Sequence, residues 1–401
     1  MTVTGRRALP SAWRFVTAFG VVSLLADVVY EGARAVTGPF LASLGAGATA
    51  VGVITGLGEA CAFAGRLGSG PLADRTRAYW PLTLVGYGLT VLAVPLLGFA
   101  SALWAAAALV LAERAGKAVR SPAKDVLLSH AAGAVGRGRG FAVHEALDQI
   151  GAIAGPLAVA AILAASPDDY RLSFWALAVP GAVTMVLLVR LRVRVPDPSG
   201  YEPDREDRRA SRPRGGGRLP KAFWGYLAFT VLTTLGYATF GILSFHLVAR
   251  HLVPVAVVPM LYAGAMGVDA VAAVATGWLY DRVGRRSLVV VPLLSAAVAP
   301  LALHSSPTPA ICGVLLWGAV LGIQESTMRA AVADLVPTAR RGSAYGLFAA
   351  GFGGATLAGS ALLGALYDHS TSSAIAVAIG IQVAALVLFP VVGLHRRPTA
   401  R

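Results

Sequence analysis

Residues 70–77, Gly-Pro-Leu-Ala-Asp-Arg-Thr-Arg, resemble residues 277–286, Gly-Trp-Leu-Tyr-Asp-Arg-Val-Gly-Arg-Arg, which begin 207 positions later. We call these stretches the first and the second basic motif. Each lies between two apolar segments of helix length, so each is predicted to form a tight, positively charged turn between two membrane helices. A repeated turn implies a repeated half. Membrane proteins of two similar halves often bind a substrate between them, so the pair favours transport.

Composition indicates a membrane protein independently of any motif. The chain has 401 residues, of which 56% are hydrophobic and 13% charged. Soluble domains carry about 25% charged residues, and one membrane-spanning helix needs roughly 20 apolar residues. The predicted fold is therefore an all-α integral membrane protein with about twelve transmembrane helices in two pseudo-symmetric six-helix bundles. The predicted spans are 13–42, 49–69, 80–100, 103–121, 139–165, 172–191, 221–249, 255–278, 288–303, 309–328, 342–366 and 373–394.

The net charge of +14 follows the predicted topology. Basic residues gather at the N-terminus, in alternate loops and in the tail, whereas the other loops hold few, such as Arg171 and Arg250. This asymmetry predicts a multi-pass protein of the plasma (inner) membrane with both termini in the cytoplasm, and it argues against nucleic-acid binding. The basic positions are Arg6, Arg7, Arg14, Arg75, Arg77, Lys124, Arg137, Arg139, Arg282, Arg285, Arg286, Arg340, Arg341, Arg396 and Arg397.

One long polar stretch divides the chain. Residues 193–219 combine mixed charge, Pro and Gly, which is typical of a flexible linker. We therefore expect an N-terminal bundle at 1–192, a cytoplasmic linker at 193–219 and a C-terminal bundle at 220–401. A second repeat supports this division at a constant offset of 204. Arg137, Gly138, Phe141, Ala154 and Gly155 match Arg341, Gly342, Tyr345, Ala358 and Gly359.

On these motifs the chain resembles the major facilitator superfamily of secondary transporters. The basic motifs are similar to that family's Gly-x-x-x-Asp-Arg-x-Gly-Arg-Arg signature, and the second copy is the fuller one. Arg114-Ala-Gly-Lys-Ala118 resembles its Arg-x-x-Gln-Gly. Residues 151–156, which include Gly151, Gly155 and Pro156, resemble a Gly-x-x-x-Gly-Pro motif associated with proton-driven exporters; Val159 and Ala160 replace its trailing glycines. Gly151 and Gly155 also permit close helix packing.

The resemblance implies a gating latch on the cytoplasmic face, formed in the outward-facing state. The alternative is that the basic motifs only set the topology. The residues expected in the latch are Gly70, Asp74, Arg75, Gly277, Asp281, Arg282, Gly284 and Arg285.

Ionisable groups within membrane helices are costly, so they are candidates for function. Most lie in the N-terminal half. Asp27, Glu31 and Arg34 are spaced by four and three residues, which places them on one helical stripe. Two neighbouring spans add Glu113, Arg114 and Lys117, and His144, Glu145 and Asp148.

These charges predict either a proton-coupling site or a fixed salt-bridge network. In the first case we expect Asp27, Glu31 and Asp148 to carry the proton, Arg114 to be the partner that switches, and His144 to relay it.

Other polar residues are expected in an ion pair, in a second site or in a gate. Glu59 is expected to pair with Arg66 or Arg34. Asp269 is either a second ion site or is bound by a neighbouring hydroxyl group. The expected inner-gate cluster consists of Gln324, Glu325 and Arg329.

Three functional classes remain open. The first is a proton-coupled antiporter that exports a small organic molecule. The second is a symporter, or a carrier of a metal ion or organic anion. The third is a membrane-embedded enzyme or receptor, which we do not favour because no nucleophile or metal triad has a suitable context. The two cysteines, Cys61 and Cys312, both lie in apolar spans. We expect no bound cofactor or metal, and a monomer that contacts lipid, substrate and protons.

Overall fold

A computed structural model describes residues 10–201, 219–337 and 340–394, without the side chains of Arg137 and Arg329. Most of the predicted linker, and the basic positions Arg6, Arg7, Arg396 and Arg397, lie outside the described residues. Throughout the described part the regular structure is helical.

The N-terminal half consists of eight α-helices and a short 3₁₀ helix. They are α1 (Ala12–Ser43), α2 (Ala48–Ala64), α3 (Arg66–Thr76), α4 (Tyr79–Leu97), α5 (Leu103–Val135), α6 (Arg137–Ala165), α7 (Tyr170–Ala176), α8 (Ala178–Arg194) and η1 (Pro198–Tyr201).

The C-terminal half repeats this pattern with more interruptions, including a π-helical turn, η3. Its elements are α9 (Lys221–Leu235), α10 (Phe240–Ala249), α11 (Val257–Val283), η2 (Gly284–Val289), α12 (Val290–Ala302), α13 (Pro307–Ile323), η3 (Gln324–Met328), α14 (Arg329–Leu335), α15 (Arg341–His369) and α16 (Thr371–Val391).

Within the described residues, ten stretches are long and apolar enough to cross a membrane. One of them, Val257–Ala302, contains both α11 and α12, with a turn at Gly284 where φ is +64°. Helix α5 is not among the ten because it carries many charges, although its 33 residues are long enough to span. Counting α5 and dividing the long stretch gives twelve segments, which agrees with the sequence prediction.

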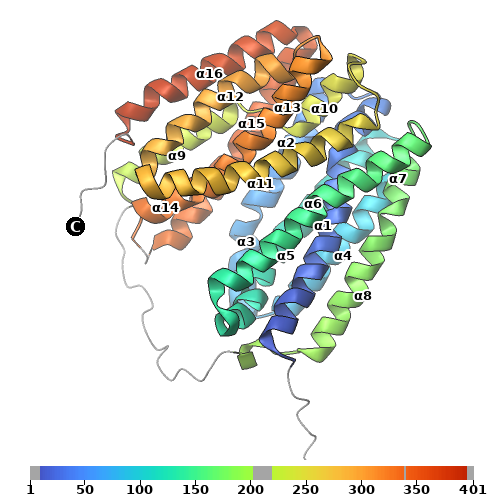
Figure 1. The fold of residues 1–401 in the computed structure, drawn as a ribbon, viewed down its shortest axis with the longest axis vertical. Coiled ribbons are helices and arrows are strands. Elements are labelled where there is room, and N and C mark those ends of the chain that lie inside the picture. The colour runs from blue at the N-terminus through green and yellow to red at the C-terminus, as the bar shows by residue number, and fades with distance from the viewer. Residues whose placement is uncertain (1–9, 202–218, 338–339, 395–401) are drawn as a thin grey trace, which may run out of the picture.

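The segments form two bundles that meet along a central seam (Figure 1). Helices α2 and α15 pack together along this seam, and α6 packs against α11. Each bundle has its own apolar core: Phe15, Phe19 and Leu188 are fully buried in the first, and Phe229 and Val314 in the second. We call the end of the molecule where α8 ends and α9 begins the linker end, and the opposite end the far end.

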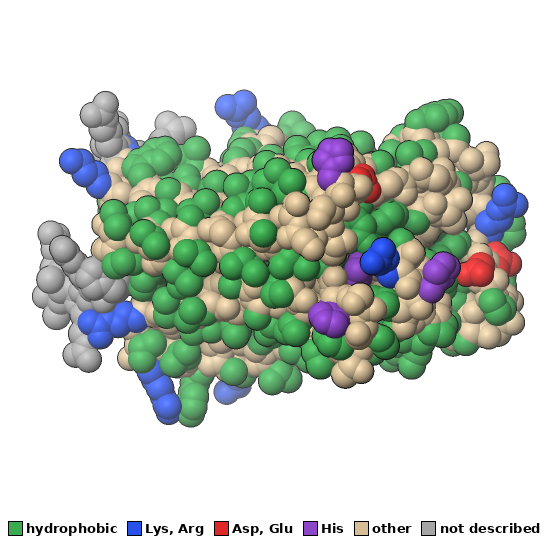
Figure 2. All heavy atoms as spheres, turned by 90° about the horizontal axis from the view of Figure 1, so that it is seen from above, with side chains coloured by type: hydrophobic (Ala, Val, Ile, Leu, Met, Phe, Trp, Pro, Cys, Tyr) green, Lys and Arg blue, Asp and Glu red, His purple; other side chains and the backbone are tan. Residues whose placement is uncertain are grey.

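Hydrophobic side chains are spread widely over the face seen from the top of Figure 1, Lys and Arg side chains lie mainly near its borders, and His side chains gather on its right part (Figure 2). Large apolar side chains stay exposed along the helices, for example Trp104, Val274 and Val391. An apolar exterior of this kind suits contact with lipid rather than water.

The repeated positions perform the same task in both halves. Helices α6 and α15 begin at the matched residues Arg137 and Arg341, and both contain 29 residues. A Cβ atom on Gly155 would lie 2.4 Å from the carbonyl oxygen of Val28 in α1. One on Gly359 would lie 2.3 Å from the carbonyl oxygen of Leu235 in α9. Each glycine therefore lets its helix touch the first helix of its own bundle.

The structure corrects two expectations about loops. The basic motifs are mostly helical, because α3 continues to Thr76 and α11 to Val283. Only Arg77, with φ of +51°, and Gly284 leave the helical conformation. Helix α5 runs to Val135, fourteen residues beyond the predicted end, because Pro122 is tolerated inside it. That extension moves Lys124 from a predicted loop into the bundle.

Candidate functional site

A cavity of about 300 Å³ lies between the two bundles. Its N-terminal wall comes from α1, α2, α3, α5 and α6, and its C-terminal wall from α9, α11, α13, η3 and α15 together with the segment between α9 and α10. Among the described lining residues, all five Lys and Arg side chains belong to the N-terminal wall. The acidic lining residues number eight, six of them on that wall. The charged residues are Arg34, Arg66, Lys117, Arg120, Lys124, Asp27, Glu31, Glu59, Asp125, Glu145, Asp148, Asp269 and Glu325.

The halves close against each other at the far end. The backbone N–H groups of Ala48 and Thr49, at the start of α2, donate to the carboxylate of Asp368 in α15 at 2.9 and 2.8 Å, and the Thr49 hydroxyl donates at 2.5 Å. Gly38 of α1 leaves no room for a side chain, since its Cβ would lie 2.3 Å from the carbonyl oxygen of Gly241 in α10. In α1, α2 and α15 the residues that line the cavity lie nearer the linker end than these contacts. The far end is therefore sealed in this conformation.

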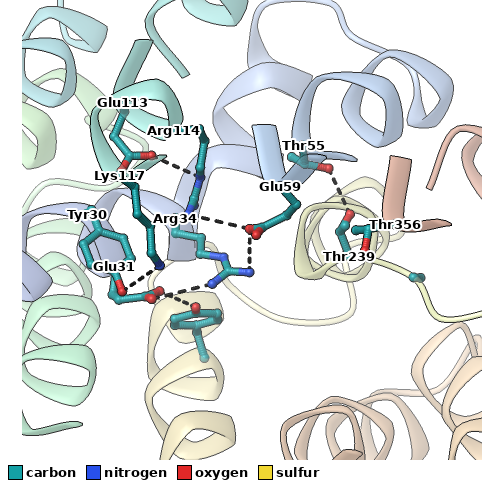
Figure 3. A network of polar contacts seen from close by, with 12 residues as sticks. Tyr30, Glu31, Arg34, Thr55, Glu59, Glu113, Arg114, Lys117, Thr239 and Thr356 are labelled. Carbon is teal, nitrogen blue, oxygen red and sulfur yellow. Dashed lines mark hydrogen bonds and ion pairs between the residues drawn. The ribbon is translucent and has the colours of Figure 1, made fainter. Parts of the chain in front are cut away.

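Arg34 is the centre of an ion network on the N-terminal wall (Figure 3). Its guanidinium lies 2.8 Å from the Glu59 carboxylate of α2 and 3.5 Å from the Glu31 carboxylate one helical turn away. Glu31 also accepts a hydrogen bond from the hydroxyl of Tyr262, which belongs to α11 in the other half. The network thus connects three helices and spans the interface between the bundles.

Among the described residues, Arg114 does not form an ion pair with Asp27, Glu31 or Asp148, the carboxylates between which it was expected to switch. Its guanidinium lies 3.1 Å from Glu113 and 3.6 Å from Glu59. It is 6% exposed and lines a smaller adjoining pocket instead of the main cavity. Arg114 therefore holds the Glu59 carboxylate on the side of the ion network that faces away from the main cavity.

Lys117 does reach the main cavity. Its ammonium group donates a hydrogen bond of 3.1 Å to the Tyr30 hydroxyl and lies 4.3 Å from the centre of the same ring (Figure 3).

Lys124 is the functional candidate that the sequence interpretation missed, because it was assigned to a basic loop. The Lys124 ammonium lies 3.7 Å from the Asp148 carboxylate, and both groups line the cavity. On the side away from the cavity, His144 lies 3.3 Å from the same carboxylate oxygen and 2.9 Å from the Ser23 hydroxyl. A continuous polar chain thus leads from the cavity through Asp148 to a buried imidazole. The spacing of Lys117, Ser121 and Lys124 was the available signal, since it continues the polar face of α5.

Asp27 and Glu145 complete the predicted set. Asp27 is 9% exposed and lines the cavity, and no hydrogen bond or ion pair to its carboxylate is seen within the described residues. Gly151 of α6 packs directly on it, because a Cβ there would lie 2.9 Å from the Cβ of Asp27. Glu145 also lines the cavity but is largely exposed. The neighbouring Pro156 lies inside α6.

The C-terminal wall holds the remaining buried carboxylate. Asp269 of α11 accepts a hydrogen bond of 3.1 Å from the side-chain amide of Gln149 in α6. Its partner is thus an amide from the other half, whereas the alternatives considered from sequence were a second ion site or a hydroxyl bond. Gln324 and Glu325 of η3 line the same wall. The side chain of Arg329 lies outside the described residues, so the predicted cluster is seen only in part.

The basic motifs lie at the linker end, where Asp74 and Asp281 are both exposed. No ion pair of either carboxylate occurs in the part of the chain that the structure describes, and Arg75 is likewise exposed. Arg282 stacks over the Trp278 ring at 3.6 Å. Arg285 is partly buried. Cβ atoms added at Gly70 or Gly277 would meet open space. In this conformation, within the described residues, the two motif carboxylates therefore form no ion pair that would act as a latch.

A metal-binding arrangement is not evident either: no group of three or more His, Cys, Asp or Glu side chains that could hold an ion occurs in the described ranges. The cavity offers carboxylates, ammonium groups and hydroxyls, which can bind ions and polar molecules and can exchange protons.

Comparisons with known proteins agree with this architecture. The chain matches the Major Facilitator Superfamily in two overlapping regions, residues 21–323 and 231–401. The chain belongs to this superfamily. It is therefore a multi-pass membrane transporter. An uncharacterized Mycobacterium tuberculosis protein is 55% identical over 389 residues, covering 96% of this chain and 94% of the relative. An uncharacterized MFS-type transporter of Methanocaldococcus jannaschii is 24% identical and covers 88% of both chains.

Solved transporters share the fold at low identity. A mutant of the nucleoside transporter NupG superposes with a TM-score of 0.75 at 13% identity, covering 94% of this chain and all of that one. A POT family transporter in complex with 5-aminolevulinic acid also gives 0.75, at 15% identity over 95% and 97% of the two chains. A bacterial Spinster homologue, solved inward-facing and unoccupied, gives 0.65 at 14% identity and covers 96% of both. These likenesses describe the fold alone.

Proposed function

We propose that this superfamily member is a proton-coupled antiporter that exports a small organic molecule by alternating access. The observation that carries the proposal is the pair of carboxylates at one place in the cavity wall. Asp148 is held by Lys124 at 3.7 Å, while Asp27 lines the cavity without an ion pair among the described residues. A carboxylate that is not neutralised by a cation inside a membrane protein is favoured to take up a proton.

The coupling step follows from these contacts. When Asp27 releases its proton and Asp148 takes one up, the neutral Asp148 carboxyl group no longer forms an ion pair with Lys124, while the Asp27 carboxylate becomes charged. Lys124 then turns toward Asp27, and the bundles can rearrange around the cavity. His144, on the protein side of Asp148, holds or passes the proton through its bond to that carboxylate. In this scheme Lys124 takes the switching role first expected of Arg114.

The orientation of the transporter also belongs to the proposal. Positive charge gathers at the linker end, so we place that end and both termini in the cytoplasm of a cell whose plasma membrane the protein crosses. The sealed far end then faces outward, and the conformation described here is open toward the cytoplasm. The basic motifs form their latch in the opposite state, when the linker end closes. The protein is proposed to work as a monomer.

Inverted membrane vesicles with an acidic interior provide the test. An acridine dye reports the pH gradient while organic compounds are added one at a time. An exported compound should release protons from the vesicles and restore the dye fluorescence. Asp27→Asn and Asp148→Asn should abolish this response. The control is Asp168→Asn, which removes an exposed carboxylate in a far-end loop at φ of +60°, where Asn is well tolerated.

Two results would reject the proposal. If both cavity variants kept transport with an unchanged pH dependence, the proton would not travel through these carboxylates. If a compound entered right-side-out vesicles together with protons, the protein would be a symporter.

A further inference from the structure

The C-terminal wall of the cavity contains polar atoms that the proposed coupling mechanism does not use. Gln324 is 2% exposed and lines the cavity, yet neither its amide oxygen nor its amide nitrogen has a hydrogen-bond partner among the described residues. The Oδ1 atom of Asp269 and the hydroxyl of Thr234 are buried in the same wall and likewise have no partner in the part of the chain that the structure describes. A buried polar group without a partner costs about 1–3 kcal/mol. Such groups are expected to be satisfied by something that enters the cavity.

These residues line one cavity, and the helices that carry Asp269 and Gln324 touch. A Cβ atom on Gly322 of α13 would lie 2.1 Å from the backbone oxygen of Asp269 in α11. Gln324 follows two residues later. Asp269 and Gln324 both line the cavity, so the carboxylate and the amide belong to the same wall.

The backbone is irregular on both sides of this site. Gln324 begins the π-helical turn η3, and such turns often occur at functional sites. The helix opposite is interrupted between α9 and α10, where Tyr237 and Ala238 line the cavity. Trp317 holds the interruption in place: its indole N–H donates to the Ala238 carbonyl at 2.9 Å, and its own carbonyl accepts from the Tyr237 hydroxyl at 2.5 Å. Interrupted helices mark substrate sites in several transporter folds.

The negative charge of this wall favours a positively charged ligand. Its described lining residues include Asp269 and Glu325 but no Lys or Arg. Tyr237, Met266 and Phe352 add apolar and aromatic surface. A cation with N–H donors suits the free Asp269 oxygen and the Gln324 carbonyl, and an attached apolar body suits the rings.

We propose that Asp269 and Gln324 form a head-group subsite for a substrate with a protonated amine on an apolar or aromatic body. The ammonium group donates to Asp269 Oδ1 and to the Gln324 amide oxygen, while Gln149 keeps its bond to the other carboxylate oxygen. This assignment rests on the proposed function as a transporter of organic molecules, which it narrows to amines. It also moves Gln324 from the expected inner gate to the substrate site.

Binding to the purified full-length protein tests the subsite without requiring transport. The probes are phenylalkylamines with two to six methylene groups, each compared at pH 7 with its alcohol and its carboxylate of equal length. Thermal unfolding in detergent, followed by the intrinsic tryptophan signal, reports binding. We expect the amines to raise the unfolding midpoint, and the alcohols and carboxylates to leave it unchanged.

Variants locate the binding. Asp269→Asn preserves the shape of the side chain and should weaken amine binding by about tenfold or more, because a charged hydrogen bond is lost. Gln324→Leu should weaken it by about tenfold for the same reason. Asp168→Asn removes an exposed carboxylate outside the cavity and should change affinity by no more than about threefold. Unfolding without ligand shows that each variant is folded, and if one is not, the other carries the test.

The assignment is overturned if no amine binds, if the alcohols or carboxylates bind equally well, or if both Asp269→Asn and Gln324→Leu keep full affinity. These failures differ from failure of the proposed function. Vesicles that exchange protons for a neutral or anionic compound would leave the antiporter in place and reject only the amine subsite.

Discussion

The two walls of the cavity come from halves that repeat each other, yet they use charge in different ways. On the N-terminal wall, Glu59 is paired with Arg34 and Asp148 with Lys124 from neighbouring helices, while Asp27 has no ion pair among the described residues. On the C-terminal wall, Asp269 is met by an amide and Gln324 by nothing among the described residues. The packing glycines Gly155 and Gly359, in contrast, do the same work in both halves. The scaffold repeats, whereas the chemistry that lines it does not.

This difference suggests a division of labour. Charges that hold one another can store and release a proton as their spacing changes. Polar atoms without a hydrogen-bond partner can instead be satisfied by a bound ligand. The variants below separate these roles, beginning with the largest expected effect.

Removing one partner of the ion network should cost the most stability. Glu59→Gln leaves Arg34 and Arg114 partly unpaired in a buried site, which should lower the free energy of unfolding by about 3–5 kcal/mol. Asp269→Asn should cost less than about 1 kcal/mol, because its partner is an uncharged amide. Chemical denaturation in detergent measures both. Equal losses would mean that the two walls do not differ in this way.

The matched glycines should respond alike. Gly155→Ala and Gly359→Ala each place a methyl group within 2.4 Å of a backbone oxygen, and should each cost about 1–3 kcal/mol through overpacking. Gly70→Ala and Gly277→Ala are the controls, since both positions are helical and open. These two should be neutral or gain up to about 1 kcal/mol from helix propensity. A loss in only one half would argue against equivalent packing.

The far-end seal should depend on Asp368. Its carboxylate caps the start of α2 from the other half, so Asp368→Ala should cost about 0.5–2 kcal/mol and favour separation of the bundles. Spin labels at the exposed positions Ser43 and Ser372 should then report longer distances. Asp169→Ala is the control, because Asp169 caps α7 within one half, with Leu172 N–H donating at 2.9 Å. Longer distances in the control as well would show that loss of any cap loosens the far end.

The smallest effect on stability is expected at the basic motifs. Asp74 and Asp281 are exposed, so Asp74→Asn and Asp281→Asn should change the free energy of unfolding by less than about 0.5 kcal/mol. Both should nevertheless slow transport if the latch forms in the other state. Asp334→Asn is the comparison, since it weakens a 2.7 Å bond from the Tyr280 hydroxyl and should cost about 1 kcal/mol. Unchanged transport in both motif variants would leave them only a topological role.

Much of the fold was predictable from the sequence, and the errors have clear causes. The twelve segments followed from hydrophobic length, which depends only on local composition. The predicted end of α5 was wrong because Lys124 was counted among the basic residues of a loop, whereas the helix continues to Val135. The π-helical turn at Gln324 and the interruption at Tyr237 left no comparable signal, because both depend on contacts with other helices.

The sequence by itself determined that the chain spans a membrane, that its halves repeat, and which residues are costly to bury. Helix period and hydrophobic length are properties of a single segment, so the sequence shows them without any knowledge of the neighbouring helices. Only the tertiary structure decided which charges meet. Arg114 lies beside Glu59, and Asp148 beside Lys124, because of the way separate helices pack. Spacing along one helix carries no information about the neighbour across it, so the pairing that proton coupling needs could be found only in three dimensions.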